Sequence, residues 1–292
     1  MAALQERAML VHLNLRHWTA TKNDRRVVEE VAEKHQTNGC DIGSFNKRLI
    51  NPEALKPIKQ LVGQARTDHY ELSLPFDDAG WRLLPAAAYE GYCAQMSRHR
   101  ERFERHRDAF LRDYEDLVRD AERELGTLYR AREYPTRGRL AERFGFKTAF
   151  RPIPDGGHFV VDVAAEQKDS IDRETLQAAE RAAADVWQRV HDRAQKLAAG
   201  LRAYADDCGE VQRNFRCSLV ENVVHLADLL PKLNFTGDPR LDQMARRLRD
   251  ELCQFEADTL KTDPTLRHEV AEKAEAVRNE VDHLLAGMAG YV

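Results

Sequence analysis

The stretch of residues 86–129 contains no proline and only two glycines, Gly91 and Gly126. Since proline and glycine are the residues that most often end helices, the sequence predicts one continuous helix here. At about 1.5 Å per residue, this helix is roughly 60 Å long. Helices in globular proteins average about 11 to 12 residues, so such a length predicts an extended helical stalk rather than a compact globule.

Apolar side chains recur along this predicted helix in steps of mainly three and four, which is the spacing of a coiled-coil seam. Arg100 and Arg107 interrupt the pattern. An apolar stripe on a long helix needs a surface to cover it, and identical copies are a common source. We therefore expect homo-oligomers held by a self-association seam of Met96, Phe103, Phe110, Tyr114 and Leu117.

Most of the remaining chain is also predicted to be helical. A second long helix is expected over residues 170–204, with an apolar stripe that begins at Leu176 and ends at Tyr204. Asparagine or aspartate followed by proline is a typical helix start, and such pairs stand at residues 51–52, 238–239 and 263–264. Shorter helices are expected at residues 25–35, 51–66, 211–230, 238–260 and 263–288.

Strands are predicted where apolar and polar residues alternate, at residues 9–15, 70–74 and 159–163, with residues 77–80 as a hairpin turn. The expected fold class is mainly α with a small antiparallel β-sheet (α+β), in which a long antiparallel helical stalk or coiled coil carries a small mixed head. The expected domains are a mixed α/β head (residues 1–85), the long helix with a basic-aromatic loop and a strand returning to the head (86–169), and a helical bundle or stalk (170–292).

The start of the long predicted helix is basic, with five arginines and two histidines in residues 97–107. These arginines spread around the helix, and Glu101 stands four residues before Arg105, the favourable order for an ion pair. Acidic residues follow at once, and the net charge of −4 gives the chain no global attraction to nucleic acid. We interpret this stretch as a solvated helix face.

Residues 129–151 are a stronger candidate for nucleic-acid binding, because aromatic residues are interleaved with cations. Arginine with exposed aromatic rings is the combination that single strands favour. The alternative is a loop that folds its aromatic rings back onto the helices and leaves its arginines outside. The candidate contacts are Arg130, Arg132, Arg137, Arg139, Arg143, Lys147 and Arg151.

The sequence contains no G-x-x-x-x-G-K-[ST], G-x-G-x-x-G or G-x-S-x-G motif. The stretch HEVAE, beginning at His268, lacks the second histidine of a zinc motif. Asp155 and His158 surround two glycines, and we interpret them as part of a turn. We therefore expect no enzyme activity, no cofactor and no metal.

Five cysteines without C-x-x-C spacing favour a reduced, intracellular setting. Glu6 and Arg7 interrupt the region where a signal peptide would be continuously apolar. No run approaches the roughly 18 apolar residues that cross a bilayer. We expect a cytoplasmic protein with no membrane contact.

Four phrases of the sequence resemble, in this order, an uncharacterised family of tailed-phage proteins: NKRLINPEALKPI, LPFDDAGWRLLPAAAYEGY, YPTRGRLAERFGF and FRPIPDGGHFVVDV. The step from Gly80 to Pro85 is similar to a GxRLLP-like step of that family. Genes of such proteins often neighbour those of a MoxR-type AAA+ ATPase and a cobaltochelatase-like von Willebrand A protein. The resemblance implies an adaptor or assembly role beside an AAA+ ATPase in an infected bacterial cell, and no catalytic residues.

Two functions of different classes follow as hypotheses. The first is a non-enzymatic helical protein that self-assembles or acts as an adaptor or scaffold. The alternative is a single-strand nucleic-acid-binding protein of phage replication, or an antagonist of host defence. An enzyme whose site is assembled from residues that cannot be paired by sequence is a further alternative.

Overall fold

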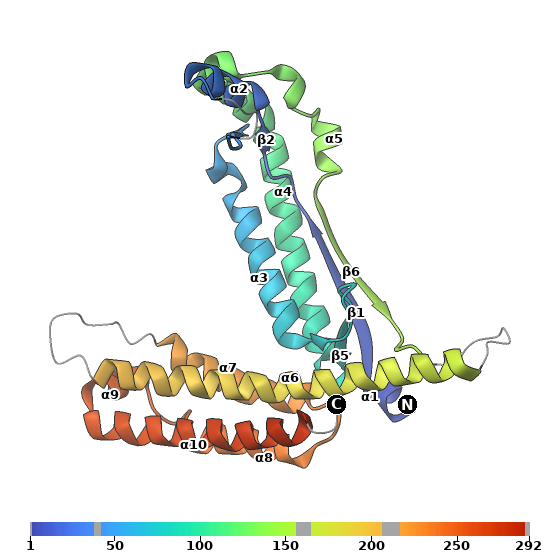
Figure 1. Cartoon of the computed structure of the whole chain (residues 1–292), viewed down its shortest axis with the longest axis vertical. Helices are drawn as coiled ribbons and strands as arrows, with labels where there is room; N and C mark the ends of the chain where they lie inside the picture. Colours follow the sequence, from blue (N-terminus) through green and yellow to red (C-terminus); the bar gives the residue numbers. More distant parts are fainter. Residues whose placement is uncertain (1, 38–41, 156–164, 206–216, 290–292) are drawn as a thin grey trace. The chain divides into compact units, whose positions relative to one another are not determined.

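The computed structural model of the chain describes residues 2–37, 42–155, 165–205 and 217–289 (Figure 1). The chain divides into two compact units, each with its own hydrophobic core. Unit 1 comprises residues 1–12, 70–92 and 149–292, and unit 2 comprises residues 13–69 and 93–148. This division differs from the three consecutive domains expected from the sequence, because several single helices and strands contribute residues to both units.

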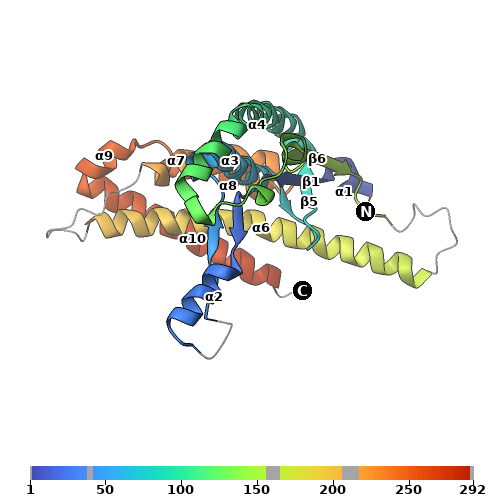
Figure 2. The same ribbon diagram turned by 90° about the horizontal axis from the view of Figure 1, so that it is seen from above.

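Unit 1 consists mainly of helices. Its longest helix, α6 (Ala165–Ala205), lies alongside α10 (Pro264–Ala289), as Figures 1 and 2 both show. Helix α7 (Ser218–Leu233) packs against α6 and against α8 (Pro239–Glu251). The short helices α1 (Ala2–Arg7) and α9 (Ala257–Thr262) and the 3-10 turn η2 (Ala86–Ala88) also belong to this unit.

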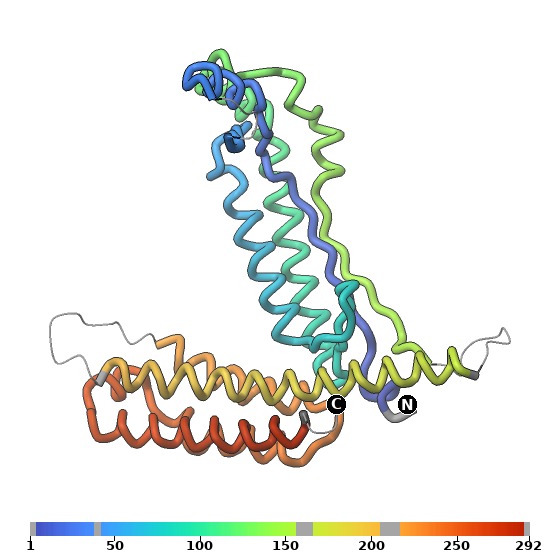
Figure 3. Tube along the Cα trace, viewed as in Figure 1, coloured from blue at the N-terminus to red at the C-terminus, as the bar shows by residue number. Residues whose placement is uncertain are grey.

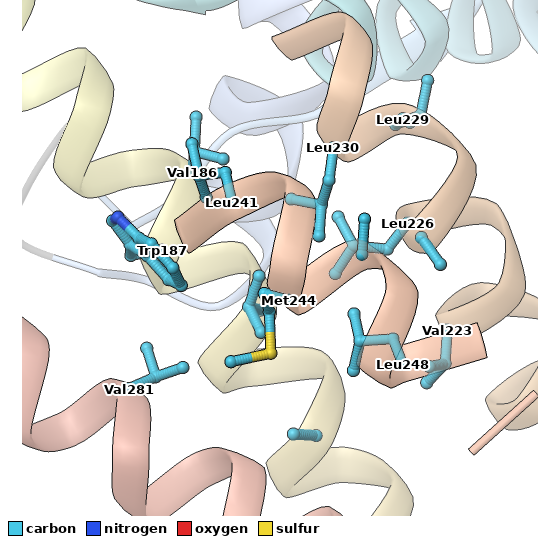
Figure 4. Close-up of a cluster of buried hydrophobic side chains, with 14 of the residues drawn as sticks. Val186, Trp187, Val223, Leu226, Leu229, Leu230, Leu241, Met244, Leu248 and Val281 are labelled. Carbon is cyan, nitrogen blue, oxygen red and sulfur yellow. The ribbon is translucent and has the colours of Figure 1, made fainter. Parts of the chain in front are cut away.

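The core of unit 1 lies between these helices, and Figure 4 shows part of it. The apolar stripe predicted for residues 170–204 is buried from Val186 to Leu201 and half-buried at Tyr204, and Trp187 beside it is buried too. Its first residue departs from the prediction, since the side chain of Leu176 is 54% exposed. A fully buried Val or Leu stabilises the fold by about 1.5–3 kcal/mol. On α10, Val270, Ala274, Val277 and Val281 are buried as well.

Four strands form a small antiparallel sheet in the order β4-β5-β1-β6. They are β1 (Ala8–Arg16), β4 (Leu74–Pro75), β5 (Arg82–Pro85) and β6 (Gly145–Arg151). In the register of β1 with β5, Met9 lies opposite Leu84. The strand predicted at residues 9–15 is thus confirmed, whereas β6 was not predicted.

The turn predicted at residues 77–80 joins β4 to β5. The carboxylate of Asp77 accepts a hydrogen bond of 2.9 Å from the backbone N–H of Trp81. Gly80 has a φ of +87°, in the left-handed region that favours glycine. The strand predicted at residues 70–74 is wrong except at its end, because helix α3 continues to Leu72 and the side chain of Tyr70 is exposed.

Unit 2 is built around an antiparallel pair of helices, α3 (Lys56–Leu72) and α4 (Tyr89–Leu125), of which residues 56–69 and 93–125 belong to this unit (Figures 1 and 3). Asp68 joins the pair. Its carboxylate accepts a hydrogen bond of 2.6 Å from the side chain of Gln95 and lies 2.6 Å from Nε2 of His99. Helix α4 confirms the long helix predicted at residues 86–129. It ends at Leu125, directly before Gly126, which adopts a φ of +50°.

Smaller elements surround this helix pair in unit 2. Strands β2 (Thr21–Asn23) and β3 (Asn46–Arg48) form a two-stranded antiparallel sheet. The predicted helix at residues 25–35 is confirmed as α2 (Arg25–Lys34). The other short elements are η1 (Pro52–Leu55), η3 (Gly126–Leu128), η4 (Ala131–Glu133) and α5 (Arg137–Ala141).

The predicted helix ends are only partly confirmed. The helix predicted at residues 238–260 is two helices, α8 and α9, and α7 continues past Pro231 to Leu233. The strand predicted at residues 159–163 lies outside the described residues. The predicted fold class is confirmed, since the protein is mainly helical with long helices and small antiparallel sheets.

Candidate interaction surface

The apolar residues predicted to form a self-association seam on α4 lie inside unit 2. Met96, Phe103, Phe110 and Tyr114 are buried, with Phe103 only 1% exposed, and Leu117 is partly buried against the same core. The rings of Phe103 and Phe146 lie 5.8 Å apart, centroid to centroid. The stripe is covered by the chain's own segments, so these side chains are not free to form a seam with a second copy.

The cations of residues 129–151 are placed differently from the seam. Arg130 is half-buried, and Arg151 is half-buried in unit 1, where its guanidinium lies 3.2 Å from the carboxylate of Asp77 and 4.0 Å from the ring centre of Trp81. The remaining five cations are exposed, and we call them the cationic segment: Arg132, Arg137, Arg139, Arg143 and Lys147.

The cationic segment belongs to unit 2 and follows η4, α5 and the first residues of β6, which run in succession along that unit (Figure 1). Within the described ranges, none of its five cations forms an ion pair with an acidic side chain. By contrast, arginines such as Arg189 and Arg247 are each paired with a carboxylate on their own helix. The segment therefore carries positive charge that its surroundings leave uncompensated.

Tyr134, Phe144 and Phe146 of this stretch pack in or against the core of unit 2, whereas Phe150 lies in unit 1 and is 41% exposed. Phe144 is 5% exposed, and its ring centre lies 5.6 Å from that of Phe110. The hydroxyl of Tyr134 donates a hydrogen bond of 2.6 Å to the carbonyl oxygen of Leu49, and burial raises the pKa of Tyr134 to about 12. For these three rings the structure has the alternative arrangement considered from the sequence, in which the rings fold back, and five of the seven candidate cations stay outside.

A buried ammonium group anchors the start of this stretch. Lys47, on β3, is 2% exposed, and its Nζ lies 2.7 Å from Oε2 of Glu133 and 3.0 Å from Oδ2 of Asp24. It also donates a hydrogen bond of 2.7 Å to the carbonyl oxygen of Leu128. The three protons of the ammonium group thus have three oxygen atoms nearby, which is the condition for burying such a charge without a large penalty.

The charges of this cluster reinforce one another. Burial alone lowers the pKa of Lys47, but Glu133 and Asp24 outweigh that effect and the pKa is raised. The hydrogen bond from Lys47 in turn lowers the pKa of Asp24. No local pattern in the sequence predicts this cluster, since Lys47 stands between two other polar residues in NKR and its partners are distant in the chain.

Unit 1 contains a cavity of about 1030 Å³. Apolar side chains such as Met9, Phe76 and Ile171 line it, together with Arg151 and Arg181. Arg181 donates a weak hydrogen bond of 3.5 Å to the carbonyl oxygen of Phe76. The described lining contains no histidine, cysteine or lysine, but it includes the carboxylates of Asp77, Asp78, Asp155 and Glu174, of which Asp77 is paired with Arg151.

The remaining sequence candidates do not form a site in the described residues. His268 lies 3.2 Å from Glu272, and both side chains are exposed on α10. Asp155 lines the cavity, whereas His158 lies outside the described residues. No group of three His, Cys, Asp or Glu side chains in the described part of the chain could hold a metal ion. No helix there is long and apolar enough to cross a membrane.

The model of a family described as a protein of unknown function, DUF3150, matches residues 5–208, which is more than half of the chain. No curated protein and no solved structure matches it.

Proposed function

We propose that this chain, which belongs to the DUF3150 family, is a non-enzymatic adaptor that receives an acidic partner protein on its cationic segment. The observation that carries this proposal is the set of five exposed cations without an ion-pair partner among the described residues. Adaptor function needs a surface for a partner and no catalytic group, which agrees with a chain that has no catalytic motif.

The fold supports recognition at this segment because the segment is anchored on the inside. Lys47 holds Leu128 and Glu133, and the hydroxyl of Tyr114 donates a hydrogen bond of 2.9 Å to the carbonyl oxygen of Pro135. An anchored backbone loses less conformational entropy on binding than a free loop does. Single exposed ion pairs contribute about 0–1 kcal/mol each, so we expect several weak contacts whose sum depends on salt.

The resemblance described above makes an AAA+ ATPase the first partner protein to test. A scaffold made of several copies remains part of the proposal, although the α4 stripe does not provide its interface, since those side chains are buried in unit 2.

Nucleic acid is the second candidate partner, because exposed cations also neutralise phosphates. The burial of Phe144 and the engagement of Tyr134 remove two of the rings that would stack on bases and leave Phe150 as the exposed one, so such binding would rest mainly on charge. Among these two partners, the arrangement therefore favours an acidic protein surface over a single strand.

The test is fluorescence anisotropy with three labelled probes at low salt: poly-glutamate, a single-stranded oligonucleotide and a duplex. The test variant carries Arg137→Glu, Arg139→Glu and Arg143→Glu. A control variant carries Arg119→Glu and Arg123→Glu, since these exposed arginines are already paired with Asp116 and Asp120 on α4.

The proposal expects poly-glutamate to bind the native chain and the control, and to lose most of its affinity for the test variant. Tighter binding of the oligonucleotides than of poly-glutamate would favour the nucleic-acid candidate. Absence of binding to all three probes would reject a role for the cationic segment.

A further inference from the structure

Strand β6 is an edge strand of the four-stranded sheet. Among the described strands, β1 is its only neighbour. An edge strand presents a row of backbone N–H and C=O groups that have no partner within the sheet. With seven residues at about 3.3 Å each, β6 offers an edge of roughly 23 Å.

The sequence of β6 leaves this edge suitable for pairing. The strand contains no proline, and none of its residues is fully buried, so no other described element covers it completely. One charged residue, Lys147, stands in its middle. A lysine on an edge strand commonly discourages pairing with a neutral or basic strand, but it attracts an acidic one.

Positive charge surrounds the first half of the strand. Arg143 stands two residues before it, and residues 143–151 contain no aspartate or glutamate. Arg16 of β1 lies against the strand, because a Cβ atom placed on Gly145 would be 3.2 Å from Nε of Arg16. Gly145 thus leaves room for a third cation beside Arg143 and Lys147.

We propose that the free edge of β6 receives an extended acidic segment of the partner protein as an added strand. This inference rests on the proposed function and specifies the form in which the partner binds. In strand addition, backbone hydrogen bonds supply the affinity and side-chain contacts supply the specificity. Here Arg16, Arg143 and Lys147 favour a strand that carries carboxylates. A purely electrostatic contact would not require the acidic segment to be extended.

The decisive probe is a labelled octapeptide that alternates glutamate with valine, compared with the same peptide carrying N-methyl groups on alternate residues. Methylation keeps every charge but removes the N–H donors of one edge. We expect the methylated peptide to bind the full-length protein at least about tenfold more weakly, because each lost backbone hydrogen bond reduces the affinity several-fold.

Two proline variants give an independent measurement. Adjacent residues of a strand direct their N–H groups to opposite sides, so Lys147→Pro and Thr148→Pro test the two edges of β6. We expect one variant to lose thermal stability through its contact with β1. The other should keep the native melting temperature and lose peptide binding.

Equal affinity for the methylated and unmethylated peptides would overturn strand addition while leaving charge-based docking intact. Failure of both peptides and of poly-glutamate to bind would overturn the proposed function as well. If both proline variants unfold, the comparison of the two peptides on the native protein still decides the question.

Discussion

The Nζ atom of Lys47 lies 2.7 Å from a carboxylate oxygen of Glu133, in the interior of unit 2. Glu133 follows the exposed Arg132 directly in the chain. Glu133 is therefore paired with an internal cation, Lys47, and is not paired with the exposed Arg132 beside it. The inward position of the Glu133 side chain thus has two consequences: it pairs with Lys47, and it leaves the positive charge of the cationic segment on the outside.

Replacing Lys47 with methionine is expected to destabilise the protein by about 3 kcal/mol, because Glu133 would be left as an unpaired carboxylate and Asp24 would keep only the more distant Arg26, at 3.5 Å. Urea unfolding followed by circular dichroism measures this change. Arg48→Met is the matched control, since Arg48 is the exposed neighbour on β3. Equal stability of the two variants would show that the Lys47 cluster does not stabilise unit 2.

The same cluster predicts a pH dependence. The pKa of Asp24 is lower in the folded protein than its usual 3.8, so its stabilising effect is present above about pH 4 and is lost as the pH falls through the folded value. The difference in unfolding free energy between the native protein and Asp24→Asn should therefore be constant near neutral pH and shrink below about pH 4. A difference that does not change with pH would contradict this assignment.

Introducing charge into the α4 stripe is expected to unfold unit 2 rather than to separate copies of the chain. Phe103→Glu and Phe110→Glu each bury a carboxylate in the core, which costs several kcal/mol or more. The melting temperature and the mass from light scattering measure the two effects. Leu176→Glu is the control, because that leucine is exposed on α6. A folded variant of lower mass would instead restore the stripe as an interface.

The cysteines are expected to differ in reactivity. Burial raises the pKa of Cys253 to about 11, whereas Cys217 is exposed near Lys261. Because the thiolate is the reactive form, a thiol reagent at neutral pH should label Cys217 well before Cys253. Peptide mass spectrometry at successive times measures both sites. Earlier labelling of Cys253 would mean that its surroundings open readily.

Periodicity predicted the elements that bury one face along much of their length. On α6, the predicted stripe enters the core of unit 1 from Val186 to Leu201. Strand β6 was missed because its residues are half-buried or exposed in no regular alternation. The cations of the segment that contains β6 predicted a binding surface there, but no strand.

The candidate site was predicted in part. The sequence identified the cations of residues 130–151, but it could not tell that Phe144 and Tyr134 turn inward, because that depends on distant partners such as Phe110 and Leu49. The Lys47 cluster had no local signal, since its parts come close only when separate segments have folded together. Long-range ion pairs of this kind leave no spacing rule in a sequence.

The interleaving of the two units along the chain has a consequence for how such a gene can change. Unit 2 consists of two segments, residues 13–69 and 93–148, that are both enclosed by segments of unit 1. A single recombination breakpoint or stop codon cannot release either unit intact. The two units are therefore inherited together. Replacing one of them by recombination requires the exchange of more than one separate gene segment.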